Sequence, residues 1–457
     1  MKTYDLIVIG GGPGGYVAAI KAAQLNAKVA LIEKEKVGGI CLNHGCIPTK
    51  TLLKSTKVYK TLLSAKDYGV LVDGDITFDW TAMVKRKDTV VRRLTAGVGS
   101  LLKKNGVDVY DGEGKPVNAT KVEVNGETLE AKYLMIATGA RPIIPPIPGL
   151  KEAMEKEIVI TSRELLQIKE APKSLVVIGG GVIGIEFATM FKQLGSEVIV
   201  IEKMPGILPM IDDDVRDAYV KILKKDGVEV LTEAEVVSFE DNKVIYKHNG
   251  KDELIEAEKV LLSIGMRPNV EGFESLGIQI ERQGIVTNEY LQTTVPNIYA
   301  IGDVNGKYML AHVASAEGII AAEHMFSERK PKMRYDRVPS AIYGSPEIAS
   351  IGITEQEAKE KKINYKASTF PLAGNGRALS ENEKDGFVKL IVEEGSKEVL
   401  GAHILAYNAS ELIAEIGVTM ELEGTAYELG STIHAHPTLS EIIMEAAHGA
   451  IDKPIHF

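Results

Sequence analysis

The fold is decided by the stretch LIVIGGGPGG, residues 6–15. Residues 6–9 form a short apolar run, which predicts a strand that is covered on both faces of a sheet. The glycines that follow keep the spacing G-x-G-x-x-G, and they are Gly10, Gly12 and Gly15. Such glycines allow a tight turn and the close approach of a pyrophosphate to the N-terminus of the helix predicted after them. The stretch therefore predicts a Rossmann-like dinucleotide-binding unit.

A second strand and an acidic residue complete this unit, and the unit then occurs again. Residues 29–32 are apolar and lead to Glu33, whose carboxylate can accept hydrogen bonds from a ribose. Residues 175–202 repeat the order of strand, glycine turn, helix and strand, and end at Glu202. The glycines of this second copy are Gly179, Gly181 and Gly184. One glycine motif can be an ordinary turn of an α/β sheet, whereas two complete copies indicate two bound dinucleotides and electron transfer between them.

Glu202 also indicates which dinucleotide the second unit prefers. A carboxylate about 4 Å from a phosphate charge opposes it by roughly 4 kcal/mol at an effective dielectric constant near 20. Lys203 is the only base directly beside it. The second site should therefore prefer NAD to NADP, unless Glu202 is simply a solvated strand end.

The chain contains only two cysteines, Cys41 and Cys46. Gly45 permits a bend, and Pro48 suits the first turn of a helix that would carry residues 49–59. Both sulfur atoms would then lie at the N-terminal end of this helix, where the dipole lowers the pKa of a thiol from its usual value of about 8.5. The pair could close and reopen as a disulfide, or could be two buried, inert cysteines. No matching set of further ligands accompanies them, so no metal site is expected.

Length and composition limit the class of protein. A chain of 457 residues suggests about three domains, and 45% hydrophobic with 25% charged residues is typical of a globular protein. A formal net charge of −10 disfavours binding to nucleic acid. No run of eighteen apolar residues and no signal peptide occurs, so a cytoplasmic protein without membrane spans is expected. A mature organelle protein would look similar.

The segment around the cysteines, GGICLNHGCIPTK at residues 38–50, resembles the redox-active loop of the class I pyridine nucleotide–disulfide oxidoreductases. The family pattern is G-G-T-C-x-N-x-G-C-x-P-[ST]-K. Ile40 stands here where Thr is commonest, which adds no titrating group. His44 occupies the variable position; it could tune the electrostatics of the sulfur atoms, but an exposed loop histidine is the favoured interpretation.

This resemblance implies roles for the loop. Cys41 would be the interchange cysteine that meets the substrate, and Cys46 would lie against the flavin. Lys50 would lie near the reducing edge of the flavin and pair with Glu186, which stands just after the second glycine motif. On the residue pattern alone, Lys50 could equally be a solvated helix residue.

Further matches extend the resemblance over the whole chain. Residues 137–142, ATGARP, resemble the motif where the chain crosses from the flavin domain to the NAD domain, and residues 265–269, GMRPN, resemble the exit from the NAD domain. Residues 294–303 resemble the second flavin motif, which ends in Asp303, and MLAH at 309–312 follows it. The FAD-binding residues that the resemblance and the glycine motif imply are Gly10, Gly12, Gly15, Glu33, Lys50, Thr138, Gly139, Asp303 and Ala311. The NAD-binding residues are Gly179, Gly181, Gly184, Glu202 and Gly265.

The C-terminal third resembles the interface domain that builds the dimer of the family. Within residues 433–441, IHAHPTLSE, the histidine before proline is His436, which the family uses as an acid–base group supplied by the partner subunit. An imidazole suits proton exchange with a thiol near neutral pH. Glu441 would orient this ring, although TLSE is also a capping box in which Glu441 could seal a helix. His434 is expected to be structural or to support the residues that meet the substrate.

The sequence thus predicts an α/β fold with two Rossmann-like dinucleotide-binding domains and a C-terminal α+β dimerisation domain. The expected parts are a first FAD-binding part (1–145), an NAD-binding domain (146–265), a central FAD-side segment (266–335) and an interface domain (336–457). Helices are expected near 51–66 and 80–104, and an antiparallel ribbon over 111–136 with Asn125-Gly126 as its hairpin turn.

The implied function is oxidation of protein-bound dihydrolipoamide to lipoamide, with FAD as cofactor and NAD as acceptor, through a Cys41–Cys46 disulfide. The implied partners are a second copy of the chain and the lipoyl domains of a 2-oxo acid dehydrogenase or glycine-cleavage complex. A glutathione-reductase-like enzyme is the alternative, although it would need bases for NADPH where Glu202 stands. A binding protein that docks onto an acyltransferase core is a further hypothesis, compatible with catalysis.

Overall fold

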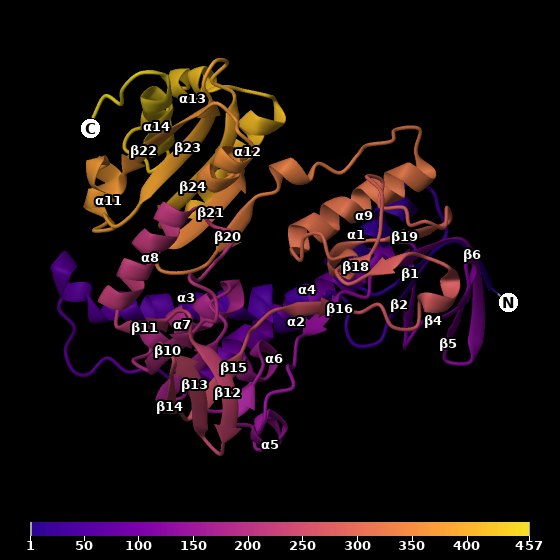
Figure 1. The fold of residues 1–457 in the computed structure, drawn as a ribbon. Helices are drawn as coiled ribbons and strands as arrows, with labels where there is room; N and C mark the ends of the chain where they lie inside the picture. The colour runs from indigo at the N-terminus through magenta and orange to yellow at the C-terminus, as the bar shows by residue number, and fades with distance from the viewer. Residues whose placement is uncertain (1, 457) are drawn as a thin grey trace.

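The computed structural model describes residues 2–456, and its sheets gather in three regions (Figure 1). The first sheet has the strand order β3-β2-β1-β6-β5-β4, and β19 also pairs with β6. Its strands are β1 (Lys2–Ile9), β2 (Val29–Glu33), β3 (Asp108–Asp111), β4 (Lys115–Asn118), β5 (Lys121–Val124), β6 (Glu127–Ile136) and β19 (Ile298–Ala300). β1 runs parallel to both β2 and β6, as expected of a Rossmann-like sheet. Leu6, Ile7 and Val8 are fully buried, so the predicted strand covered on both faces is confirmed.

Two helices distant in sequence cover one side of this sheet. α1 (Pro13–Gln24) follows the first glycine turn, and α9 (Ala311–Phe326) packs against it. The contact is made by small residues: a Cβ atom on Gly318 would lie 2.7 Å from the carbonyl oxygen of Gly14. A Cβ atom on Gly14 would also lie 3.0 Å from the carbonyl oxygen of Ala314, so the N-terminal turns of the two helices are neighbours.

The predicted antiparallel ribbon is only partly correct. β5 and β6 form the expected hairpin through Asn125 and Gly126, which both have positive φ angles (50° and 77°). From Leu129 onward, however, β6 runs parallel to β1, and β3 runs parallel to β2. β6 therefore leaves the ribbon because its last residues, such as Leu134 and Ile136, are buried in the first sheet.

The second region repeats the Rossmann-like arrangement. Its parallel sheet has the order β11-β10-β9-β15-β8. The strands are β8 (Val159–Ile160), β9 (Ser174–Ile178), β10 (Glu197–Ile201), β11 (Val228–Leu231) and β15 (Lys259–Leu262). α7 (Val182–Gln193) follows the second glycine turn, and α8 (Asp213–Lys225) connects β10 to β11. A three-stranded antiparallel sheet of β12 (Glu235–Glu240), β13 (Lys243–His248) and β14 (Lys251–Glu256) lies between β11 and β15 in the chain.

Two antiparallel strands join the first and second regions. β7 (Ala140–Pro142) pairs with β16 (Met266–Pro268), so the two crossings of the chain lie side by side. The predicted helices are also present, as α3 (Cys46–Leu63) and α4 (Trp80–Lys104). Within residues 2–456, none of the helices combines the length and the apolar character that crossing a membrane requires.

The third region is an antiparallel sheet in the order β20-β21-β24-β23-β22. Its strands are β20 (Ser340–Ile342), β21 (Glu347–Gly352), β22 (Tyr365–Pro371), β23 (Phe387–Glu393) and β24 (Val399–Ala406). α12 (Ala409–Glu421) and α14 (Glu441–Ile451) pack on this sheet, and their apolar residues share its core. The two Rossmann-like α/β regions and the antiparallel α+β region together agree with the predicted fold class.

Candidate active site

The first glycine of each motif makes a turn that another residue could not make without strain. Gly10 and Gly179 have nearly equal φ angles of +106° and +104°. A Cβ atom on Gly10 would lie 2.2 Å from the carbonyl oxygen of Ala137, and one on Gly179 would lie 2.5 Å from that of Ser263. Both positions therefore require glycine.

The other glycines of the motifs leave room at two helix N-termini. A Cβ atom on Gly15 or Gly184 would meet the carbonyl oxygen of the first glycine, at 1.9 Å and 2.2 Å respectively, because the helix packs directly on the turn. The middle glycines are the N-caps of α1 and α7, and no side chain caps either helix. A Cβ atom would find only Gly39 Cα, 3.9 Å away, at Gly12 and nothing within 4 Å at Gly181. Open space beside free helix N–H groups fits a pyrophosphate.

The acid at the end of each second strand is held by the same two bonds. Glu33 accepts hydrogen bonds from the backbone N–H groups of Gly11 (2.6 Å) and Glu35 (2.7 Å). Glu202 accepts them from Gly180 (2.7 Å) and Met204 (2.7 Å). Each carboxylate is thus fixed beside its glycine turn, which is the position that a ribose-binding acid needs. Glu202 is therefore not a freely solvated strand end.

The cysteine loop folds as two helices rather than one. Cys41 lies in α2 (Gly39–His44), and Cys46 is the first residue of α3, with Gly45 between them. Cys41 thus belongs to a different helix from Cys46, but its thiol contacts the Cys46 sulfur at the start of α3, in agreement with the prediction that both sulfur atoms lie at the N-terminal end of that helix. The helix also begins three residues before the predicted Thr49, because Pro48 can stand anywhere in the first turn, where no N–H group needs a partner.

The two cysteines are free thiols of unequal acidity. The Cys41 thiol donates a hydrogen bond to the Cys46 sulfur, which lowers the pKa of Cys46 against the opposing effect of burial. The positive charge of Lys50 lowers it further. The same hydrogen bond, together with burial, raises the pKa of Cys41. Cys46 is therefore the more acidic thiol of the pair, and the two sulfur atoms lie within reach of each other.

Lys50 and Glu186 form the ion pair that the sequence predicts. The ammonium group of Lys50 donates to both carboxylate oxygens of Glu186, each at 2.8 Å, and lies 4.7 Å from the centre of the Tyr343 ring. The backbone N–H of Tyr343 also donates to Glu186 (3.1 Å). The side chain of Glu186 is only 4% exposed, so these partners take the place of the water that would otherwise surround its carboxylate. The pair joins α3 to α7, and thus links the cysteine loop to the second glycine motif.

The two crossing motifs bind each other. The side chain of Thr138 donates to the carbonyl oxygen of Asn269 (2.8 Å), and the Asn269 amide donates back to the Thr138 carbonyl (2.9 Å). The backbone N–H of Asn269 donates to Gly139 (2.9 Å), while the N–H of Ile143 donates to the carbonyl of Gly265 (3.0 Å). Thr138, Gly139 and Gly265 are thereby fixed at the joint between the first two regions.

Asp303 lies in a short 3-10 turn, Gly302–Asn305, directly before α9. Burial raises its pKa to about 6. Ala311 is the first residue of α9, whose N-cap, Leu310, provides no capping side chain. Both lie where the first sheet and the N-terminus of α9 meet, so an acceptor and free N–H groups face the same region.

Sequence reasoning missed the residue that holds this turn. Glu317 is fully buried in α9 and accepts hydrogen bonds from the Gly302 N–H (2.6 Å), the Asn305 amide (2.9 Å) and the Tyr335 hydroxyl (2.5 Å). A glutamate within the largely apolar helix AHVASAEGIIAAEHMF was the available signal.

Asn43 was missed in the same way: its buried amide donates to the carbonyls of Val37 (3.2 Å) and Gly39 (3.0 Å) and so closes the cysteine loop.

His436 and Glu441 are in contact but lie apart from the cysteines. Glu441 is hydrogen-bonded to Nδ1 of His436 at 2.9 Å, and the ring is 79% exposed. Although burial opposes it, the Thr438 N–H and the His436 ring lower the pKa of Glu441. Among residues 2–456 no hydrogen bond or ion pair joins His436 to either cysteine, and Figure 1 shows α14 well separated from α2. One copy of the chain therefore does not bring the imidazole to the sulfur atoms.

The capping box expected at residues 438–441 is only half formed. The Thr438 N–H donates to Glu441 (2.7 Å), but the Thr438 hydroxyl is buried without a partner, and α14 begins at Glu441 itself.

The surroundings of the two remaining histidines, His434 and His44, differ from each other. His434 is buried and bonded to Glu415 (2.7 Å) and the Thr432 carbonyl (2.9 Å), in agreement with a structural role. His44 is partly buried near Glu35, not fully exposed.

Two family matches cover most of the chain. Residues 4–318 match the family described as pyridine nucleotide-disulphide oxidoreductase, and residues 338–447 match the dimerisation domain of the same family. The chain belongs to the pyridine nucleotide-disulphide oxidoreductases. This family membership confirms the predicted fold class, the oxidoreductase activity and the use of FAD and NAD, and the dimerisation domain agrees with a homodimer.

Individual relatives share this family and its fold. A protein of Acholeplasma laidlawii named dihydrolipoyl dehydrogenase is 60% identical over 73% of this chain and 99% of its own length. A dihydrolipoyl dehydrogenase of Bacillus subtilis is 43% identical over 99% of both chains. The solved structure of the HOCl-induced flavoprotein disulfide reductase RclA from Escherichia coli, as its Cu(II) complex, has a TM-score of 0.87 at 30% identity and covers 98% of this oxidoreductase and 99% of its own chain.

Proposed function

We propose that this oxidoreductase oxidises protein-bound dihydrolipoamide to lipoamide and reduces NAD to NADH, with release of one proton. The observation that carries the proposal is the thiol pair of Cys41 and Cys46. The two sulfur atoms lie within reach of each other and near the charge of Lys50, which pairs with Glu186 beside the second glycine motif. Relatives of the same family, 40–60% identical to this chain, are named dihydrolipoyl dehydrogenase. The proposal joins these two observations.

In the proposed reaction the cysteines begin as a disulfide. A substrate thiolate attacks the Cys41 sulfur and forms a mixed disulfide, while Cys46 leaves as a thiolate. The second substrate thiol, as thiolate, then displaces Cys41 and closes the lipoamide disulfide, so two electrons remain on the cysteine pair. Lys50 and the Cys41 thiol stabilise the Cys46 thiolate, since both lower its pKa.

His436 from a second copy of the chain would move the protons. Its ring is exposed, and Glu441 fixes the orientation of Nδ1, which leaves Nε2 free to take a proton from the substrate thiol. The tautomer follows from this contact, because the carboxylate accepts the Nδ1 proton. A dimer is needed because the ring lies far from the cysteines of its own chain.

The residues around the two glycine loops fit FAD and NAD. The first loop, Glu33 and the joint at Thr138 and Gly139 would hold FAD, with Asp303 and the N-terminus of α9 toward its flavin side. The second loop, Glu202 and Gly265 would hold NAD. Bound FAD supplies the two-electron chemistry that connects a dithiol to a nicotinamide.

The preference for NAD is argued from Glu202. Both oxygens of this carboxylate accept backbone hydrogen bonds, so its negative charge stays where a 2′-phosphate would lie. Lys203, the basic residue next to it in the chain, pairs instead with Glu235 at 2.6 Å. A glutathione-reductase-like enzyme that uses NADPH is therefore disfavoured.

We divide the chain into a first FAD-binding part (1–145), an NAD-binding domain (146–265), a central FAD-side segment (266–335) and an interface domain (336–457). Lipoyl domains of a 2-oxo acid dehydrogenase or glycine-cleavage complex are the proposed protein partners, with no nucleic-acid or membrane partner. A cytoplasmic location completes the proposal.

An anaerobic titration with NADH tests the proposal. The purified protein should show flavin absorbance, and reduction should produce a long-wavelength charge-transfer band. Cys41→Ser should keep the flavin and the dimer but lose lipoamide reduction. Colourless protein that cannot be reconstituted with FAD, or a Cys41→Ser variant as fast as the wild type, would refute the proposed reaction.

A further inference from the structure

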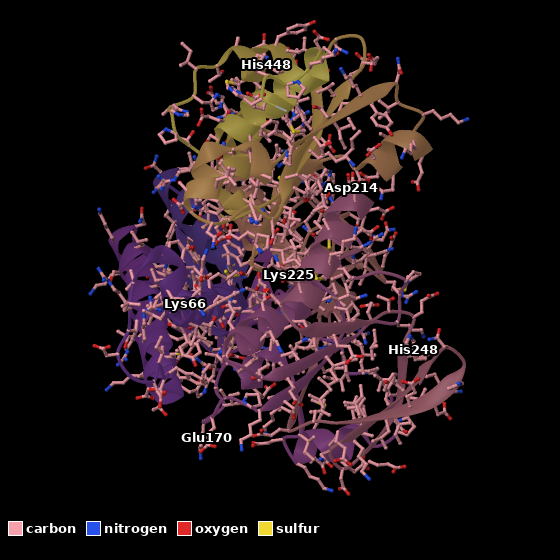
Figure 2. The ribbon with its side chains drawn as sticks, turned by 90° about the vertical axis from the view of Figure 1, so that its left-hand side faces the viewer. Lys66, Glu170, Asp214, Lys225, His248 and His448 are labelled. Carbon is pink, nitrogen blue, oxygen red and sulfur yellow. The ribbon has the colours of Figure 1, made fainter. Side chains whose placement is uncertain are left out.

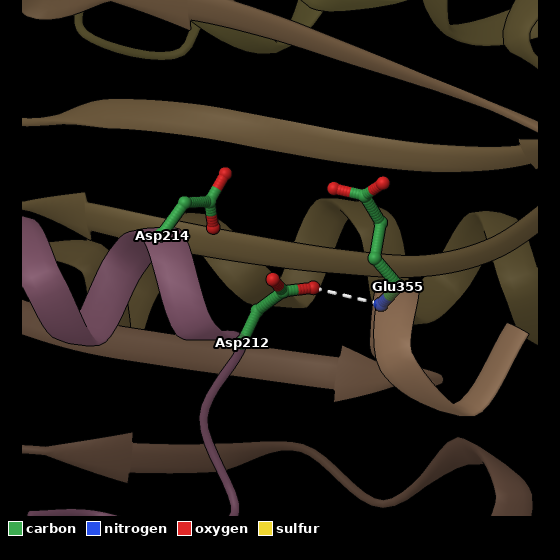
Figure 3. A group of neighbouring side chains, drawn as sticks. All are labelled: Asp212, Asp214 and Glu355. Atoms are coloured by element: carbon green, nitrogen blue, oxygen red, sulfur yellow. Dashed lines mark hydrogen bonds between the residues drawn. The ribbon is translucent and has the colours of Figure 1, made fainter. Parts of the chain in front are cut away.

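Lys389 carries a buried positive charge between the second and third regions. It lies on β23, and its side chain is only 2% exposed. The ammonium nitrogen is 3.0 Å from Asp212 and 2.9 Å from Asp214, and it also pairs with Glu355. Figure 3 shows these three carboxylates converging from α8 and α10 (Glu355–Glu360). Three carboxylates this close could hold a metal ion, but here Lys389 contacts all three and takes the central place.

Asp212 is the buried one of the two aspartates that the second region contributes to this cluster. It is 2% exposed, and both of its oxygens are used: one contacts Lys389, and the other accepts the backbone N–H of Glu355 at 2.8 Å (Figure 3). His403, also buried, lies 3.9 Å from Asp212 and bonds to the carbonyl of Ile353. These contacts of the Asp212 carboxylate are therefore all made by groups of the third region.

The segment 203–212 connects this anchor to the second glycine loop. It leaves the sheet after Glu202 and reaches Asp212 at the start of α8. Within it, Leu208 has a φ of +50°, a left-handed conformation that costs a leucine free energy and persists only where the surroundings enforce it. The N–H of Leu208 donates to the Gly180 carbonyl (3.0 Å), and Ile207 packs so closely that a Cβ atom on Gly180 would lie 2.5 Å from its side chain.

Gly180 in turn donates its N–H to Glu202, at 2.7 Å. The contacts therefore form an unbroken path from Lys389 through Asp212 and the strained segment 203–212 to Gly180 and Glu202. Loss of the Lys389 charge would leave the buried carboxylate of Asp212 beside those of Asp214 and Glu355 with no cation between them, so Asp212 and this segment would have to move.

We propose that Lys389 is a positioning residue for NAD: by holding Asp212 it keeps the segment 203–212 against Gly180 and Glu202, so that a residue of the dimerisation domain sets the affinity for NAD. This inference rests on the proposed binding of NAD at the second glycine loop. It adds to the affinity for NAD a contribution from a residue that lies outside both the NAD domain and the glycine motif.

The opposite end of α8 offers a matched control. Lys225, the last residue of this helix, pairs with Asp385 of the third region at 2.7 Å, and the two side chains are 67% and 49% exposed. Figure 2 labels Asp214 and Lys225 near the two ends of α8. The same helix is thus joined to the same region by one buried and one exposed ionic contact, and an exposed pair contributes little.

The test compares Lys389→Met and Lys225→Met in the FAD-loaded dimer. Calorimetric titration with NAD should give a Kd about tenfold higher for Lys389→Met and within about twofold of wild type for Lys225→Met. The KM for NAD should rise while kcat and FAD content stay near the wild-type values, and Lys389→Arg should recover most of the affinity. A folded Lys389→Met dimer that binds NAD as the wild type does would overturn the inference.

A second variant covers the case in which Lys389→Met does not fold. Asp212→Asn keeps the size of the side chain but removes the charge that Lys389 holds, and it should raise the Kd for NAD about threefold; an unchanged Kd in the folded dimer would then overturn the inference. Wild-type protein without any affinity for NAD would refute the proposed function instead. Normal wild-type binding together with unaffected variants would refute the positioning role alone.

Discussion

At the scale of single residues, the unequal acidity of the two thiols can be tested directly. A Cys41→Ala variant lacks the thiol that donates to Cys46, so we expect the pKa of Cys46 to rise. Ultraviolet absorbance of the thiolate against pH, in the reduced protein, measures this change. An unchanged titration in Cys41→Ala would show that the hydrogen bond does not control the thiolate.

The pair of Lys50 and Glu186 should tune the same thiol in opposite directions. The charge of Lys50 lowers the pKa of Cys46, whereas that of Glu186 raises it. Lys50→Gln should therefore raise the pKa of Cys46 and Glu186→Gln should lower it. Alkylation rates across pH report both shifts, and shifts of the same sign in the two variants would contradict the assignment.

Asp303 gives a dependence of stability on pH. Its pKa is raised from 3.8 to about 6 by burial, so the native state binds the proton more tightly than the unfolded chain. The contribution of Asp303 to the free energy of unfolding of the FAD-free protein should therefore be greatest below pH 4. It should be lost as the pH rises through about 6. The total loss is about 3 kcal/mol, because each pKa unit corresponds to 1.36 kcal/mol. Asp303→Asn should flatten this part of the profile. Chemical denaturation of both proteins at several pH values provides the measurement, and parallel profiles would exclude the effect.

At the scale of elements, α9 should depend on Glu317. In Glu317→Leu two buried donors and the partly buried Tyr335 hydroxyl lose their acceptor, and each unsatisfied buried group costs about 1–3 kcal/mol. We expect a lower unfolding temperature and loss of FAD on gel filtration, because the turn carrying Asp303 loses its fixed position. The exposed carboxylate of Glu328, just beyond α9, supplies the control: Glu328→Gln should retain FAD fully.

The elements also show what the sequence could and could not predict. The two glycine turns were predictable because backbone geometry alone demands glycine at Gly10 and Gly179, and the spacing to the acid is local. The division of the cysteine loop into α2 and α3 was not, since Pro48 tolerates several helix starts. Contacts such as Tyr343 to Glu186 and Lys389 to Asp212 join residues 157 and 177 positions apart, and no local pattern encodes such pairs.

At the scale of the whole molecule, the exposed His436 and the distant cysteines predict complementation between subunits. His436→Gln alone should lose about 10²–10⁴-fold in lipoamide turnover, since a proton-transfer group is removed. Cys41→Ser alone should be inactive. In a dimer containing one copy of each variant, the His436→Gln protomer keeps its cysteines and receives His436 from its partner, so one intact site forms. Equal mixing yields half heterodimers and should restore roughly a quarter of the wild-type activity. If the histidine served its own chain, no mixture would recover activity, so the fully inactive mixture is the result that would exclude a shared active site.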